Sequence, residues 1–344
     1  MEILVRQYLS GLLIALLLTS TQVRAQSNLT LYGILDTSLE VTNAGNGATV
    51  RMDSGGLNGS RFGLTGTEDI GAGYKIKFTL EQGISSTTGA ASNPALAFSR
   101  QAWVGVAAPW GEVRVGLQNS PVYIPVTGVL DAFTVNTLAS GMDSFLSISA
   151  RQNNAITYLS PNFHGLTGQV MVSLRDANTK PDNGIAAYNL AVEYSRGSFN
   201  SAIGYQRVTN FKGSSTLNAL FAGANYAFGP LRVFAAYHNA KITGLVDKDV
   251  FALSVSYQFS VSSMLSFGGA HAHDRSGMGN GGDQVGLMYW YFVSKRTTLY
   301  ASAAFLDNHN HATFTLNSAP TGGIPVAYPG ADPRGIQLGI QHRF

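Results

Sequence analysis

Apolar and polar side chains alternate along the chain from residue 28 to the end. In the first such segment, residues 29–41, the odd positions are mostly apolar, whereas the even positions include Asp36 and Glu40. The same alternation recurs at 74–81, 188–195, 251–257 and 285–291. A period of two residues predicts β-strands whose two faces meet different surroundings.

The connections between these segments are of two lengths, and the two lengths alternate. Short turns are expected at 68–73, 107–111, 161–165, 195–198, 229–230, 260–263 and 294–296. Long polar connections are expected at 42–56, 83–97, 118–150, 175–186, 208–216, 239–248, 274–283 and 307–333. A soluble β-sandwich also alternates, but short turns at one end and long loops at the other are typical of outer-membrane barrels. We therefore predict an all-β fold, a sixteen-stranded antiparallel transmembrane β-barrel with short periplasmic turns and long extracellular loops.

Aromatic residues recur just before the short turns. The tyrosines, spaced 31 to 36 residues apart, are Tyr158, Tyr194, Tyr226, Tyr257 and Tyr291. The phenylalanines near the same turns are Phe163, Phe199, Phe228, Phe259 and Phe292. We expect these rings to form an aromatic girdle at the inner membrane boundary. Because lipid cannot satisfy edge amides, the first and last strands should pair.

The N-terminal segment does not share the alternation. Arg6 precedes an apolar run at 12–18, and Ala25 ends a possible cleavage site. This order is typical of a signal peptide, so we predict a signal peptide at 1–25 and a single barrel domain at 26–344. Since the run is only about half of what a spanning helix needs, a membrane anchor is the weaker interpretation.

Composition narrows the class of protein further. The chain has 39 glycines and only 12% charged residues, which disfavours both a disordered and a helical protein. It has no cysteine, so no disulfide framework stabilises it. The 22 basic and 19 acidic side chains are nearly balanced, which gives no argument for a nucleic-acid partner.

Four motifs resemble the trimeric Gram-negative porins of the β-proteobacterial and neisserial type. They are LTLYGILD at 29–36, SRFGL running into GTEDIG at 60–71, YFVSKRT at 291–297 and GIQHRF at 339–344. The resemblance implies a homotrimer in the outer membrane of a Gram-negative cell, in contact with the lipid bilayer and lipopolysaccharide, with the third long loop folded into the lumen. Phe344 resembles the signal that the barrel-insertion machinery reads.

The loop at 118–150 is the candidate for this constriction loop. It is unusually apolar for a loop in water, and its apolar residues are Val122, Tyr123, Ile124, Val126, Val129, Leu130, Phe133 and Leu138. Packing inside the barrel would cover them, whereas extension into water would not. The loop also carries Asp131 and Asp143, which we expect to face the aqueous path.

Basic residues are expected on the opposite wall of the lumen. The alternation places Arg61 on the polar face, and the resemblance implies pore-lining roles for Arg100 and Arg151. Residues that share the inward phase and could extend the wall are Lys75, Lys77 and Arg114, and the acids expected to oppose it are Asp36, Glu40 and Glu81. Leu117 stands where related sequences usually carry an arginine, so the expected anion preference is modest.

These features favour a water-filled channel for passive diffusion of small hydrophilic solutes and ions. A substrate-specific channel remains the main alternative, and the loop at 307–332 could serve a second role as a receptor or adhesin. An enzyme is disfavoured because no nucleophile motif such as Gly-x-Ser-x-Gly is present. The histidine pairs at 271/273 and 309/311 lack a third ligand placed by spacing, so no metal and no cofactor are expected.

Overall fold

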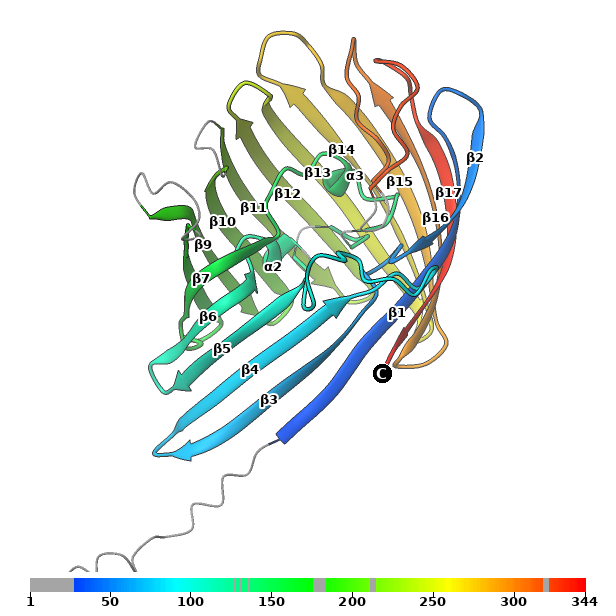
Figure 1. The fold of residues 1–344 in the computed structure, drawn as a ribbon. Coiled ribbons are helices and arrows are strands. Elements are labelled where there is room, and N and C mark those ends of the chain that lie inside the picture. Colours follow the sequence, from blue (N-terminus) through cyan, green and yellow to red (C-terminus); the bar gives the residue numbers. More distant parts are fainter. Residues whose placement is uncertain are drawn as a thin grey trace, which may run out of the picture.

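The computed structural model describes residues 28–126, 128–129, 131–134, 136–175, 184–210, 215–317 and 322–344. The predicted signal peptide at 1–25 therefore lies outside the described residues. The described chain forms one antiparallel sheet that curls into a barrel (Figure 1). Its strands are β1 (Asn28–Asn43), β2 (Ala48–Ser54), β3 (Arg61–Gly71), β4 (Tyr74–Gly83), β5 (Gln101–Ala108), β6 (Gly111–Asn119), β7 (Arg151–Leu159), β8 (Leu166–Leu174), β9 (Ile185–Arg196), β10 (Phe199–Thr209), β11 (Thr216–Phe228), β12 (Leu231–Ile242), β13 (Val246–Ser260), β14 (Ser263–Asp274), β15 (Gly282–Phe292), β16 (Thr297–Asn308) and β17 (Arg334–Arg343).

The first hairpin explains why seventeen strand segments make a sixteen-stranded barrel. Residues 37–43 of β1 pair with β2, and residues 28–34 of the same strand pair with β3. Segments β2 and β3 are thus two parts of one barrel strand, interrupted at residues 55–60. The prediction of a closed sixteen-stranded barrel is confirmed.

The barrel closes where the two ends of the chain meet. Strand β1 pairs with β17 over ten residues, from Ile34 opposite Arg343 to Asn43 opposite Arg334. Two further hydrogen bonds join Gly33 and Phe344, from the Gly33 amide to the Phe344 carbonyl at 3.0 Å and from the Phe344 amide to the Gly33 carbonyl at 3.1 Å. Closure leaves no edge strand exposed along this seam, as lipid requires.

The two faces of the sheet have opposite chemistry. Outward positions are apolar and exposed, as with Leu31, which is 61% exposed, and Leu253, which is also 61% exposed. Inward positions are polar and buried, as with Gln206, Gln284 and Gln337. Because a soluble protein would bury its apolar face, this inverted arrangement fits a barrel that stands in lipid and encloses a polar lumen.

The short turns lie where the sequence predicts them, but two of the predicted long loops are wrong. At 42–56, pairing continues to Asn43 and resumes at Ala48. At 239–248, pairing continues to Ile242 and resumes at Val246. Polar residues at these places belong to strands that extend beyond the apolar band, and polarity alone cannot distinguish such strands from loops.

Most of the predicted girdle rings lie on the outer face near the short turns. Tyr158, Tyr226, Tyr257 and Tyr291 are 40 to 44% exposed. Phe292 is the exception, because it shares the inward phase of Trp290 and stacks near it at 6.4 Å between ring centroids. The prediction for Phe292 is therefore wrong.

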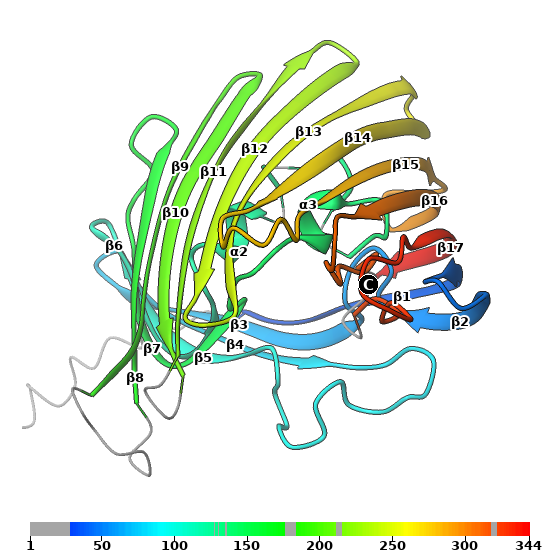
Figure 2. The same cartoon turned by 90° about the horizontal axis from the view of Figure 1, so that it is seen from above.

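The long connection between β6 and β7 folds into the barrel. It carries the short helices α2 (Tyr123–Val126) and α3 (Gly141–Ser144), which lie inside the ring of strands when the barrel is seen from above (Figure 2). Val122, Leu138 and Phe145 are fully buried in one cluster with residues of the barrel wall, including Phe221 and Val250. Among the described residues, no helix is long and apolar enough to cross a bilayer.

Polar contacts fix the inner loop to the wall formed by β10–β15. Ala132 receives a hydrogen bond at its carbonyl from Ser266 Oγ at 2.9 Å, and Gln284 Nε2 donates to the Leu138 carbonyl at 2.9 Å. At Gly286 the approach is so close that a Cβ atom would lie 2.0 Å from the Ala139 carbonyl oxygen. The loop thus occupies one side of the lumen, and the side formed by β3–β7 stays open.

Candidate functional site

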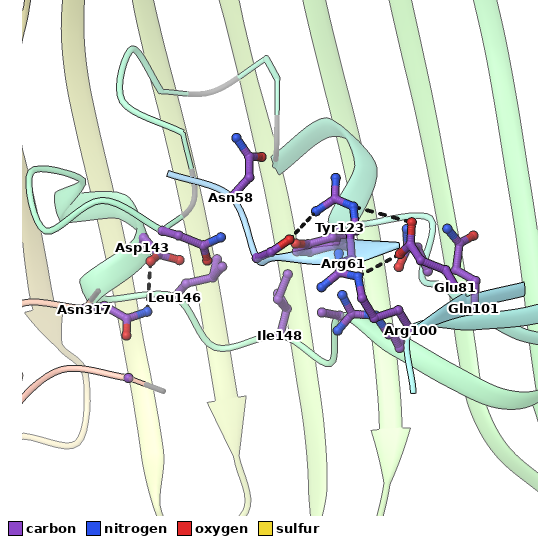
Figure 3. Close-up of a pocket in the computed structure, with 16 residues that line it drawn as sticks. Asn58, Arg61, Glu81, Arg100, Gln101, Tyr123, Asp143, Leu146, Ile148 and Asn317 are labelled. Carbon is purple, nitrogen blue, oxygen red and sulfur yellow. Dashed lines mark hydrogen bonds and ion pairs between the residues drawn. The ribbon is translucent and has the colours of Figure 1, made fainter. Parts of the chain in front are cut away.

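A cavity of about 580 Å³ lies between the inner loop and the wall formed by β3–β7. Arg61 enters it from β3, Glu81 from β4, Arg151 from β7, and Arg100 from the residue before β5. The inner loop contributes Asp143 and other residues to the opposite side. Figure 3 shows Arg61, Arg100 and Glu81 together at one side of the cavity and Asp143 at the other.

Two of the arginines share one carboxylate. Arg100 Nε lies 2.7 Å from Glu81 Oε1, and Arg61 Nε lies 3.4 Å from Glu81 Oε2. The Tyr32 hydroxyl donates to Glu81 Oε2 at 2.9 Å, and Arg61 Nη1 donates to the Gly59 carbonyl at 2.9 Å. These contacts hold both guanidinium groups at the cavity wall, and Glu81 balances only one of their two charges.

Arg151 has no such partner. It forms no ion pair with a carboxylate of the described chain, and its Nε atom is buried without a hydrogen-bond acceptor there. Its guanidinium lies over the ring of Tyr123 at 5.8 Å from the centroid. An aromatic face attracts a cation without neutralising its formal charge. Arg61, Arg100, Arg151 and Glu81 therefore leave a local excess of two positive charges beside the cavity.

The two acids of the inner loop are held in a different way. Asp131 Oδ2 accepts from Ser140 Oγ at 2.5 Å, and burial raises the pKa of Asp131 to about 7. Asp143 Oδ2 accepts from Asn317 Nδ2 at 2.9 Å. Burial, and then the charge of Asp131, raises the pKa of Asp143 well above its usual value. Only Asp143 of this pair lines the cavity.

The remaining basic residues of the predicted wall lie outside the cavity. Lys77 Nζ lies 2.8 Å and Arg114 Nε 2.5 Å from the carboxylate of Glu112. The Arg114 guanidinium also lies over the Trp103 ring at 4.2 Å from the centroid. Lys75 is exposed near the β3–β4 turn. The structure therefore separates the predicted basic wall into the three cavity arginines and a second group nearer the short-turn end.

Asp36 and Glu40 are both 0% exposed. The expectation that they oppose the arginines across the lumen is therefore wrong. Asp36 accepts from the Leu57 and Asn58 amides at 3.0 and 2.8 Å, from Tyr300 Oη at 2.7 Å and from Gln341 Nε2 at 3.0 Å. It thereby anchors the interruption between β2 and β3 to the last strands of the barrel.

Glu40 is occupied by a lumen arginine that sequence reasoning missed. Arg51 lies 3.2 Å from Glu40 Oε2 and 2.7 Å from Asp53 Oδ2. Its charge is therefore matched by two carboxylates. Arg51 falls within the predicted long loop at 42–56. The alternation along β2 is the signal that could have placed its side chain in the lumen.

Several polar residues at the cavity were also missed. Asn58 lies in the interruption between β2 and β3, and Asn317 reaches the cavity from the last long loop (Figure 3). Neither lies in a segment with a strand period, so no sequence signal pointed to them.

The histidine pairs lie at the long-loop end, with His271 and His273 in β14 and with His309 and His311 in the last long loop. Asp283 bridges two of them, with Oδ1 at 2.8 Å from His271 Nδ1 and Oδ2 at 2.9 Å from His309 Nε2. Within the described ranges, no group of three histidine or carboxylate side chains is arranged to hold a metal ion.

The raised pKa values of Asp131 and Asp143 predict that selectivity depends on pH. A raised pKa keeps a carboxyl neutral at low pH, so negative charge appears beside the cavity as the pH rises through the raised pKa of Asp143. We expect anion preference to decline as the pH is raised from about 6 to about 9, measured by reversal potential in a planar bilayer. Asp143→Asn should weaken this dependence, whereas Asp69→Asn at the exposed short-turn end should not. An identical pH profile in Asp143→Asn contradicts the assignment.

Comparisons with known proteins identify the family. The family model for Gram-negative porins matches residues 12–311. Outer membrane porin protein 32 of Delftia acidovorans is 29% identical, over 96% of this chain and 98% of that protein. A major outer membrane protein P.IB of Neisseria meningitidis serogroup B is 27% identical, over 92% of this chain and 98% of that protein.

Solved structures agree with the sequence relatives. An anion-selective porin from Comamonas acidovorans superposes with a TM-score of 0.79 at 26% identity, over 93% of this chain and all of that one. OmpT of Vibrio cholerae, in its trimer form, has a TM-score of 0.68 at 15% identity over 92% of this chain and 99% of that one, which shows the fold alone. With an inverted barrel, an inward loop and a polar lumen, the chain belongs to the Gram-negative porin family of outer-membrane channels.

Proposed function

We propose that this porin is a general diffusion channel, through which small hydrophilic solutes and ions pass passively with a modest preference for anions. The observation that carries the proposal is the charge at the cavity, where three arginines face one paired carboxylate. The arginines come from the barrel wall and the inner loop narrows the lumen opposite them, which is the arrangement by which fixed charges select among hydrated ions.

The size of the effect can be bounded from Coulomb's law. A unit charge about 4 Å from an ion changes the energy of that ion by roughly 1 kcal/mol in water, which is about a fivefold change in local concentration. Asp143 lies across the cavity and opposes this attraction whenever it is ionised. Position 117 carries leucine and not a further arginine, which also limits the excess of positive charge, so the expected anion preference is modest.

One structural neighbour is described as having the same ion preference. The barrel from Comamonas acidovorans is described as an anion-selective porin. We extend anion preference to this chain because its own arginines supply the charge, and the neighbour adds support from a related barrel.

The oligomeric state is inferred from the motifs and from one neighbour of the same fold. We infer a homotrimer, since the motifs at 60–71 and 291–297 resemble those of trimeric porins and a neighbour of the same fold has a trimer form. Lipopolysaccharide would surround the apolar outer face. Phe344, whose ring covers Gly33 at the closing seam, would be read by the barrel-insertion machinery during assembly.

Single-channel recording separates general diffusion from the alternative of a substrate-specific channel. For purified trimers in a planar bilayer, we expect conductance to grow in proportion to KCl concentration. We also expect no saturation with sugars, organic acids or nucleotides at the constriction. Saturating current with one such solute, abolished by Arg151→Ser, would instead show that the arginines form a specific binding site.

A further inference from the structure

A second cavity, of about 480 Å³, lies at the long-loop end of the barrel. Strands β12, β13 and β14 line it with residues that include Ile242, Lys248 and Ala272, and the last long loop covers it with Phe314. Its volume falls within the range of small-molecule sites. The cavity contains none of the residues that line the arginine-bearing cavity.

The unusual residue of this second cavity is Lys248. It shares the inward phase of β13 with Val250 and is only 7% exposed. Its side chain forms no ion pair or hydrogen bond with the described part of the chain. Its ammonium lies over the Phe314 ring, whose centroid is 5.1 Å from Nζ. A largely buried ammonium without a counter-charge is costly, and lysines are seldom buried without one.

Among the described residues, no neighbouring carboxylate lies within ion-pair distance of Lys248, although Asp274 stands opposite it on β14. Asp247 pairs with Lys241 at 2.8 Å. Asp274 accepts from the Ser276 amide and hydroxyl, both at 2.8 Å.

Asp249 follows Lys248 in β13, on the outward phase of the strand. Its carboxylate already has other partners. It accepts from Tyr237 Oη at 2.7 Å and from Asn239 Nδ2 at 2.8 Å, and it lies 3.3 Å from Arg275. The charge of Lys248 is therefore left for a group that enters the cavity.

The other walls of the cavity combine apolar residues with polar ones, which include His273, Asp274, Asn280 and His311. The Phe314 ring is held in place by edge-on packing against Phe145, with centroids 4.8 Å apart. At the mouth, Leu245 is 78% exposed and Met278 is 66% exposed. An inorganic ion would satisfy Lys248 but would leave these surfaces in water.

We propose that this outer cavity binds organic monocarboxylates with an apolar body, the carboxylate on Lys248 and the body against Phe314 and Met278. Such a site would hold amphipathic anions at the long-loop mouth, before the arginine-bearing cavity. Binding at this site does not depend on the ion selectivity proposed above.

Isothermal titration calorimetry of the purified trimer with sodium benzoate tests the proposal. We expect saturable binding of benzoate and at least about tenfold weaker binding of neutral benzamide, since about 1.4 kcal/mol of charge interaction gives that factor. Lys248→Met should lose benzoate binding by a similar factor. Lys295→Met, in the exposed β15–β16 turn at the other end, should bind benzoate as the wild type does.

Equal binding of benzoate and benzamide would overturn the proposal, as would unchanged benzoate affinity in Lys248→Met. The comparison of the two ligands needs only the wild-type protein, so it remains decisive if Lys248→Met fails to fold. Recording KCl conductance of the same preparations tests the proposed channel separately from the proposed benzoate site. Benzoate binding can be present or absent whether or not the protein conducts.

Discussion

Replacing Arg61, Arg100 and Arg151 together by serine is expected to remove the anion preference and shift the reversal potential towards that of a cation-preferring pore. The wild-type cavity carries an excess of two positive charges from these arginines and Glu81. In the variant, the carboxylate of Glu81 remains and reverses the sign of the local charge, and Asp143 adds to it when it is ionised. Three unit charges are removed, and each changes the local concentration of an ion by up to roughly fivefold, so the permeability ratio should change by about an order of magnitude or more.

A matched triple variant controls for the number of charges removed. Arg196, Arg275 and Arg296 are exposed at the ends of the barrel, and their replacement by serine removes the same net charge. Exposed charges more than about 10 Å from the ion path are screened at ordinary salt, so this control should keep the wild-type potential. An unchanged potential in the cavity variant, or equal shifts in both variants, would refute the role of the cavity arginines.

Phe145→Asp is expected to release the inner loop from the wall and to raise single-channel conductance. Phe145 is 0% exposed and packs in one cluster with Leu138, Phe221 and Leu306. Loss of such an aromatic side chain costs about 3–5 kcal/mol, and burying an ionised carboxylate there adds further cost. Because the barrel strands are joined independently of the loop, the barrel should remain closed while the loop leaves the wall.

Leu96→Asp provides the comparison, since Leu96 is 47% exposed in the connection between β4 and β5. That variant should conduct as the wild type does. A wild-type β-sheet circular dichroism spectrum shows that Phe145→Asp has kept its barrel. Folded Phe145→Asp protein with wild-type conductance would mean that the inner loop does not narrow the pore.

The barrel could be predicted from sequence because its cause is local. Alternation with period two fixes which side chains face out, and the turn lengths fix how strands connect, so residues such as Leu31 and Leu253 were placed without any long-range information. Arg61 was placed inward by the same rule, and the structure brings it to the cavity. Arg100 and Arg151 needed the family resemblance in addition.

The site could not be predicted in full because its details depend on distant parts of the chain. The alternation correctly turns Asp36 inward, but its burial comes from Tyr300 and Gln341, which arrive only when the barrel closes. Asn317 reaches Asp143 across 174 positions of sequence. Pairing partners at such separations leave no periodic signal, so which inward charges remain exposed to the lumen could be learned only from the structure.

The most direct test of the account is the reversal potential of the wild-type protein in a planar bilayer under a KCl gradient at neutral pH. We expect stepwise insertion of open channels whose reversal potential is displaced modestly towards the chloride equilibrium potential. A displacement towards the potassium equilibrium potential, or the absence of channel steps from the folded protein, would contradict the proposed anion-preferring channel.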